Sequence, residues 1–182
     1  MRELRTLAAV AALSIGLAAC QQADESAADS TAPAARAGLT LPVSTNAAMV
    51  GMVDQAADYI FAVGNGDLPR NDNDWHLVSN SAYTTMLSGT VIQVPGTGEF
   101  DRQWTETPEW IALSEELTRI GHDAVELAEA KSTDVESWRA VGDRLIQNCL
   151  DCHQKFKPEI PSEGILRGST ERQSRGISIF GY

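Results

Sequence analysis

Cysteine and histidine are scarce in this chain of 182 residues, which has three of each. Basic residues are also few: 14 Lys and Arg stand against 25 Asp and Glu, so the formal net charge is −11. Such a surface repels nucleic acid and the anionic face of a membrane, and it favours encounter with a basic protein surface. The chain lacks an internal repeat, and neither the apolar run 7–17 nor any later stretch is long enough to span a bilayer.

The most informative feature that is present is the stretch 149–153, Cys-Leu-Asp-Cys-His. Two thiols one helical turn apart can each reach a vinyl group on the same edge of a porphyrin, and the adjacent histidine can ligate the iron. With only three cysteines in the chain, chance is a poor explanation. The pattern predicts one covalent haem c, held through thioethers by Cys149 and Cys152, with His153 as the proximal iron ligand.

Two other interpretations of this stretch stay open. Structural zinc is almost always closed by four ligands, and no second Cys or His pair lies nearby in the sequence. A thioredoxin-like dithiol has its first cysteine just after a strand, whereas Cys149 lies well inside a helical pattern. A haem protein is therefore expected, with a zinc or dithiol protein as its rival.

The N-terminus accounts for the third cysteine. Arg2 and Arg5 precede the short apolar run, which closes with Leu-Ala-Ala before Cys20. This resembles a bacterial lipoprotein signal, in which Cys20 becomes the lipidated first residue; the alternative is ordinary secretory cleavage that leaves a free thiol. Both routes export the protein, and the expected location is the periplasm, with a lipid anchor on a membrane.

Three parts of the chain are expected from this pattern. Residues 1–19 are the signal peptide. Residues 20–40 are rich in Ala, Ser, Asp and Gln without apolar periodicity, so a flexible tether is predicted. Residues 41–182 form the folded domain and a C-terminal tail.

Apolar residues at three- and four-residue steps predict four helices in that domain. The first covers about 44–63 and the second about 72–88. The third begins at Thr107, and the fourth begins with a capping box between Thr133 and Glu136. The sequence therefore predicts an all-α protein, an antiparallel four-helix bundle with haem c bound among its helices.

The second predicted helix has the least regular apolar pattern, and the third has a seven-residue repeat. The side chains expected on the inward faces of these two helices are Trp75, Val78, Ala82 and Met86, and Trp110, Leu113, Leu117, Ile120, Ala124 and Leu127. The connection 90–106 is longer than usual bundle loops, so it is expected to cover part of the bundle, with Phe100 and Trp104 as anchors.

A bundle whose last helix carries the haem-binding pattern near its end resembles cytochrome c′ and its low-spin, cytochrome c556-like relatives. The strongest similarity lies in 149–157 and in the first-helix stretch 49–61. The resemblance implies haem c, a periplasmic setting and often a homodimer formed through the first two helices. It also implies a basic residue near the haem on the first helix, where this chain has none.

The second axial position of the iron separates two functions. Methionine there suits a one-electron carrier, whereas an apolar residue leaves an open site that binds nitric oxide or carbon monoxide. Alignment of the first helix with the family favours Met49 as the distal ligand, with Met52 as the alternative; both can also be ordinary core methionines. We expect an electron carrier with a redox protein partner, and a gas-binding protein is the alternative.

Three further residues complete the predicted site. His76 and His122 are expected to point outward, which disfavours a haem held by two histidines. Lys157 follows the haem-binding pattern at a place where the family commonly has a basic residue, so it is a candidate contact for a haem propionate; simple solvent exposure is equally compatible. The sequence offers no pair of residues typical of a catalytic acid and base, so an enzyme is not expected.

Overall fold

The computed structural model describes residues 38–157, 171–172 and 174–182. The predicted signal peptide lies outside the described residues, as does the predicted tether up to residue 37. Within the described part of the chain every regular element is a helix and no strand is present, which confirms the all-α prediction. None of the described helices combines the length and apolarity needed to cross a membrane.

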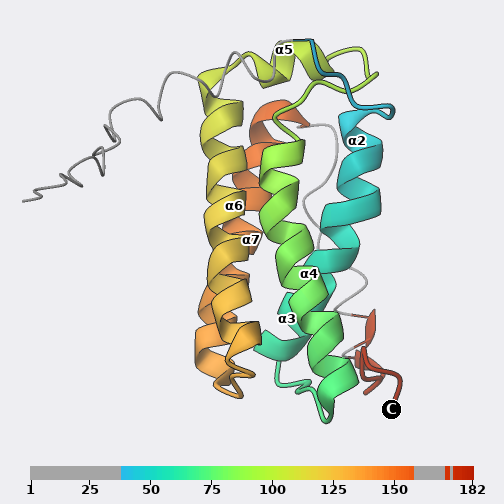
Figure 1. The fold of residues 1–182 in the computed structure, drawn as a ribbon, viewed down its shortest axis with the longest axis vertical. Helices are drawn as coiled ribbons and strands as arrows, with labels where there is room; N and C mark the ends of the chain where they lie inside the picture. Colours follow the sequence, from blue (N-terminus) through green and yellow to red (C-terminus); the bar gives the residue numbers. More distant parts are fainter. Residues whose placement is uncertain (1–37, 158–170, 173) are drawn as a thin grey trace, which may run out of the picture. The chain divides into compact units, whose positions relative to one another are not determined.

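Four long helical segments and the short helix α5 make up the packed domain. The first is continuous over three elements, α2 (Thr45–Ala48), the π-helix η2 (Met49–Asp54) and α3 (Gln55–Gly64), and it is followed by α4 (Asp72–Val91), α5 (Asp101–Thr105), α6 (Pro108–Glu129) and α7 (Val135–Phe156). The long segments pack in a closed ring, α3 on α4, α4 on α6, α6 on α7 and α7 on α3. Successive long helices run in opposite directions (Figure 1). This arrangement agrees with the predicted helical bundle.

The helix starts are fixed by side-chain caps, and one of them differs from the prediction. Thr107 caps α6 as expected, accepting from the backbone N–H of Trp110. The cap of α7 is Asp134 rather than Thr133. The carboxylate of Asp134 accepts from the N–H of Glu136 at 3.1 Å, and the Glu136 side chain pairs with Arg139 at 2.6 Å. The predicted capping box is therefore wrong, because a better acceptor stands one residue later.

The contact between α4 and α6 is tighter than the sequence pattern indicates. A Cβ at Gly89 would lie 2.3 Å from the carbonyl oxygen of Ser114, and one at Gly121 would lie 2.3 Å from the backbone nitrogen of Met86. Two backbones can approach so closely only where one has no side chain. The expected inward position of Met86 is corrected by this contact: its side chain is half-buried, and Thr85 takes the buried place.

The inward face of α6 is corrected in the same way. Trp110, Leu117, Ile120 and Ala124 are buried as predicted. Leu113 and Leu127 are only half-buried, and the small residues Ser114, Gly121 and Ala128 fill the seam instead. The seven-residue repeat therefore identifies the correct side of the helix. At Leu113 and Leu127, however, the buried position is taken by the next residue in the chain.

The connection predicted at 90–106 begins two residues later, because α4 continues to Val91. It contains the one-turn helix α5. Asp101, 2% exposed, accepts hydrogen bonds from the backbone N–H groups of Thr45 and Gly98, both at 2.8 Å. Figure 1 shows α5 lying across one end of the long helices. The connection therefore covers one end of the bundle, as expected.

The described C-terminal residues pack at the opposite end, beside the turn between α3 and α4. The carboxylate of Asp67 accepts from the hydroxyl of Ser178 at 2.8 Å and from the backbone N–H of Ile179 at 2.7 Å. The hydroxyl of Tyr182 donates to Asp74 at 2.8 Å. We call residues 177–182 the C-terminal clasp, because its contacts connect the chain end to the start of α4.

Candidate cofactor site

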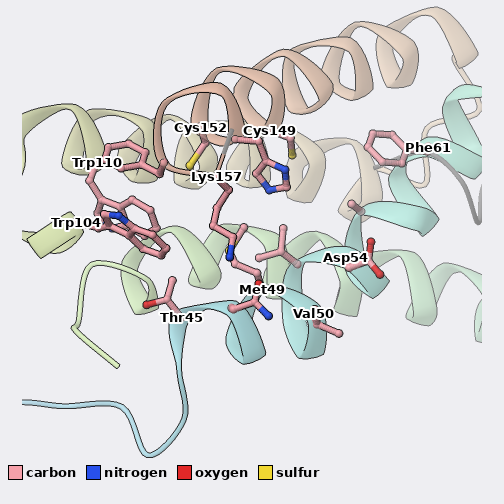
Figure 2. Close-up of a pocket in the computed structure, with 15 residues that line it drawn as sticks. Thr45, Met49, Val50, Asp54, Phe61, Trp104, Trp110, Cys149, Cys152 and Lys157 are labelled. Atoms are coloured by element: carbon pink, nitrogen blue, oxygen red, sulfur yellow. The ribbon is translucent and has the colours of Figure 1, made fainter. Parts of the chain in front are cut away.

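A cavity of about 300 Å³ lies between the first helical segment and α7. One wall comes from α2, η2 and α3, and the facing wall comes from α7. Trp104 of α5 and Trp110 of α6 lie together at one end, as Figure 2 shows. The cavity is therefore bounded on three sides by elements that are distant in sequence, and most of its lining is apolar.

The α7 wall brings together the three residues predicted from the sequence. Cys149, Cys152 and His153 all line the cavity, near the C-terminal end of a helix of 22 residues. The spacing produces this, since residues three and four apart share one helix face. Both thiols are free, and burial raises the pKa of Cys149 to about 12 and that of Cys152 to about 11. The two sulfurs are thus neutral groups in an apolar setting, unlike the low-pKa thiols of reactive dithiols.

His153 has an unmet hydrogen-bonding requirement at this wall. Its Nδ1 atom is buried and has no hydrogen-bond partner among the described residues. Burial and then the positive charge of Lys157 lower the pKa of the imidazole. A neutral imidazole with a free nitrogen is the form that binds a metal ion. The residues present at this wall therefore fit a haem that is attached through two thioethers and one histidine.

The facing wall depends on the π-helix. Two rows of side chains at four-residue steps line the cavity, namely Thr45, Met49, Val53 and Ala57, and Asn46, Val50 and Asp54. In an α-helix of 3.6 residues per turn, each four-residue step rotates around the axis, so a row gradually leaves the cavity. The hydrogen bonds of a π-helix span five residues, which lengthens the turn, so a four-residue step within η2 drifts in the opposite sense and offsets part of this rotation. The first row continues to Phe61 in α3, so the wall lines the cavity along its length.

The same wall separates the two candidate distal ligands. Met49 lines the cavity, packs partly buried against the core and faces the α7 wall. Met52 is also half-buried, but it does not line the cavity. The structure therefore places Met49, and not Met52, on the cavity wall opposite Cys149, Cys152 and His153.

Aromatic side chains close the end next to α5. Trp104 stacks on Trp110 with ring centres 5.5 Å apart, and Phe156 of α7 meets Trp110 edge-on at 5.0 Å. The indole N–H of Trp110 donates to the carbonyl of Ile92 at 2.8 Å, which fixes that ring. Such edge-on and offset ring pairs add to the apolar burial. This cluster excludes water from the cavity end. The sequence indicated Trp104 and Trp110 separately, as an anchor and as an inward side chain, but gave no sign that their rings meet.

Charge is distributed unevenly along the cavity. The ammonium group of Lys157 lies 5.9 Å from the centre of the Trp104 ring, at the aromatic end. Asp54 lies toward the Phe61 end, as Figure 2 shows, and its charge contributes to the raised pKa of Cys149. The sequence analysis had no signal for Asp54, although the four-residue step from Val50 leads to it. A carboxylate bound in the cavity is attracted to the Lys157 end and repelled from the Asp54 end.

The other predicted histidine positions agree with the structure. His76 and His122 are both exposed. Among the described residues, His122 joins Asp123 and Glu126 in the one cluster of three metal-binding side chains whose ligand atoms lie within 4.8 Å of one another. Asp123 is already paired with Arg144. Cys149, Cys152 and His153 are not among the described groups whose ligand atoms lie that close together.

The chain matches no family model, no curated protein and no solved structure. The resemblance to cytochrome c′ therefore stays a prediction from the residues at 49–61 and 149–157. What the site can do follows from its own chemistry, which is that of an apolar cavity with two thiols and an imidazole on one wall and a thioether on the other.

Proposed function

We propose that the protein is an exported c-type cytochrome of the cytochrome c′ kind, which carries one electron at a time through a covalently bound haem c. The observation that carries the proposal is the placement of Cys149, Cys152 and His153 on one wall of an apolar cavity, with Met49 on the wall that faces them. When bound, haem supplies an iron that changes between the ferrous and ferric states.

Each of these residues has a defined part in the proposal. The two cysteines hold the porphyrin edge, so their place on one face of α7 fixes the ring relative to that helix. His153 ligates the iron on the proximal side through its imidazole. Met49 supplies a soft sulfur ligand on the distal side, which favours the low-spin iron of an electron carrier. The aromatic end excludes water, and low polarity around a haem tunes its potential.

Lys157 is the proposed contact for a haem propionate. It lines the cavity and stands at the aromatic end, away from Asp54. A cation there compensates a carboxylate that would otherwise be costly to bury. The chain lacks a basic residue in the first helix, so Lys157 takes the role that the family more commonly gives to that helix.

The decisive experiment is expression in a host that matures haem c. Acid–acetone extraction should leave the colour with the protein, and the double variant Cys149→Ala, Cys152→Ala should contain no covalent haem. His153→Ala should keep the thioethers but change the iron spectrum. His122→Ala is the matched control, because its side chain is exposed and should leave the spectrum unchanged. A colourless wild-type protein from such a host would overturn the proposal and favour the zinc or dithiol alternative.

A five-coordinate, gas-binding haem protein is the second candidate. It is favoured by one observation, the exposure of Val50, which is 62% exposed and lines the cavity beside Met49. Small ligands can reach the distal wall at such an opening. Electronic spectra separate the two candidates: a low-spin ferric and ferrous haem that ignores carbon monoxide supports the carrier, and a high-spin haem that binds it supports the gas-binding protein.

The proposed location is the periplasm, with lipidated Cys20 as the membrane tether. The acidic net charge of −11 favours a redox partner with a basic surface. A homodimer through the first two helices is part of the same family expectation. Mass spectrometry of the mature N-terminus tests the tether, because a soluble protein that begins after Ala19 without an acyl chain would contradict it.

A further inference from the structure

Three large apolar side chains are exposed at the end of the bundle that α5 covers. Leu39 is 55% exposed, Val43 is 44% exposed and Phe100 is 51% exposed. We call these three residues the α5-end patch. Exposed apolar side chains are common when scattered, but a group of them on one face marks a surface for a partner or a membrane.

The three residues are held together by the backbone. The N–H of Leu41 donates to the carbonyl of Pro95 at 2.9 Å, and the N–H of Thr97 donates to the carbonyl of Val43 at 3.1 Å. These bonds lay the segment before α2 along the segment before α5. Phe100 adjoins Asp101, whose carboxylate holds the backbone of Thr45. The patch is therefore a fixed surface built from two segments.

Aromatic packing supports the patch from behind. The ring of Phe100 stacks on Trp104 with centres 6.2 Å apart, and Trp104 is itself only partly buried. Tryptophan beside exposed apolar residues is the composition found where proteins meet the interface of a bilayer. Charge at this end is net negative, with exposed Glu99 and Glu106 against the single Arg102, so a neutral lipid surface fits it better than an anionic one.

The chain itself indicates what covers the patch. Gly38, next to Leu39, is connected to Cys20 by 18 residues, which span at most about 65 Å when fully extended. A lipid on Cys20 therefore confines the domain near a bilayer, with the chain entering it beside the patch, and confinement of this kind makes a weak second contact effective.

We infer that the α5-end patch lies against the surface of the membrane that carries the anchor, with Leu39, Val43 and Phe100 in contact with lipid. This inference rests on the proposed lipidation of Cys20. The domain then meets the bilayer with its aromatic end, and the cavity opening at Val50, on the side of the bundle, stays toward solvent. Exchange of electrons or small ligands therefore occurs away from the bilayer.

The test uses the full lipidated protein in phosphatidylcholine vesicles that contain a lipid with a photoreactive diazirine in its acyl chain. After illumination, mass spectrometry locates the residues joined to lipid. The wild-type protein should react mainly within 38–44 and 99–104. Phe100→Glu and, separately, Val43→Glu should reduce this labelling severalfold. Ile177→Glu is the matched control, because Ile177 is also 51% exposed but lies at the opposite end, and it should leave the labelling unchanged.

Three results would overturn the inference. Labelling spread evenly over the domain, or unchanged in both glutamate variants, means that the patch does not touch lipid. A dimer joined through the patch by a protein-directed crosslinker in the same vesicles means that a second copy of the chain covers it. If the mature chain carries no acyl group, the proposed tether fails and the inference fails with it. Haem content measured on the same samples shows separately whether the cytochrome proposal holds.

Discussion

The backbone N–H of Thr45 donates a 2.8 Å hydrogen bond to Oδ2 of Asp101, and this bond joins the start of the first helix to α5. The same oxygen accepts from the N–H of Gly98, also at 2.8 Å. One buried carboxylate thus fixes two segments at the aromatic end of the cavity. Gly96 packs against it so closely that a Cβ there would lie 2.5 Å from Oδ2.

Replacement of Asp101 should loosen this end of the cavity. Asp101→Ala leaves two backbone donors without their charged acceptor, which should lower the free energy of unfolding by roughly 1.5–3 kcal/mol. Urea unfolding measures the change. Glu99→Ala is the control, since Glu99 is exposed in the same connection and should have little effect. Equal stability of the two variants would show that the bond is not needed.

Met49→Ala should change the iron environment if Met49 is the distal ligand. Loss of the sulfur opens the sixth position, so the haem should shift toward high spin, its reduction potential should fall, and carbon monoxide should bind readily. Spectroelectrochemistry measures all three effects. Met52→Ala should be spectrally silent and should cost less than the roughly 2–5 kcal/mol of a fully buried methionine, because Met52 is half-buried. A spectral change in Met52→Ala alone would reverse the assignment.

Gly121→Ala should separate α4 from α6. The added methyl would meet the backbone of Met86 at 2.3 and 2.4 Å, where nothing can move aside easily. Overpacking of this kind should lower the free energy of unfolding by at least about 1–3 kcal/mol. Gly142→Ala is the matched control in α7, because its Cβ would lie 3.6 Å from Phe61, an ordinary contact. We expect that variant to be neutral or slightly more stable. Thermal unfolding of both variants checks the contrast.

The cap of α7 should make stability depend on pH. The pKa of Asp134 is lowered, mainly because the hydroxyl of Ser137 donates a hydrogen bond to its carboxylate. The N–H of Glu136 adds to this effect, and burial opposes it only in part. Because this pKa is lower in the folded protein than in the unfolded chain, the ionised Asp134 stabilises the fold above the ordinary pKa of Asp, about 3.9. That stabilisation is lost as pH falls below this value and the carboxylate is protonated.

The test compares variants at two pH values. Asp134→Asn keeps a good cap but cannot ionise, so the Tm advantage of the wild type over this variant should be present at pH 7 and shrink near pH 3. Thr133→Ala should leave Tm unchanged at both values, since Thr133 does not cap the helix. A larger effect from Thr133 than from Asp134 would restore the capping box predicted from the sequence.

The first, third and fourth long helices were predictable because each is amphipathic, and α6 was helped by its capping residue Thr107; α4 has a weak apolar pattern, and the cap of α7 was placed one residue early. The wall with Cys149, Cys152 and His153 was predictable for a similar reason, since helical spacing alone puts these residues on one face. The π-helix was not predictable, because no residue in the stretch 49–54 requires it. Tertiary packing decides there between an α-helical and a π-helical turn. The same limit applies to Asp101, whose partner Thr45 is 56 residues away.

The C-terminal clasp shows a further limit of sequence analysis. The sequence pattern assigned these residues only to a C-terminal tail, without a place in the fold. Their position follows from Asp67, Asp74 and Arg70, which offer carboxylates and a cation at the turn between α3 and α4. None of these contacts is local in sequence, so no periodicity could indicate them. Polar pairing, together with the packing of Phe180 on the ring of Tyr59, determines where this segment lies.

The glycine contact between α4 and α6 divides the bundle into two halves of different stiffness. No cavity-lining side chain comes from α4, and α6 contributes only Trp110. The spacing of that helix pair is therefore independent of what fills the cavity, whereas the spacing of the first segment and α7 depends on it. In protein made without haem, amide hydrogens of α4 and α6 should stay slow to exchange while those of η2 and the last turns of α7 open early. That result would show that the pair is a scaffold that folds before the site is filled.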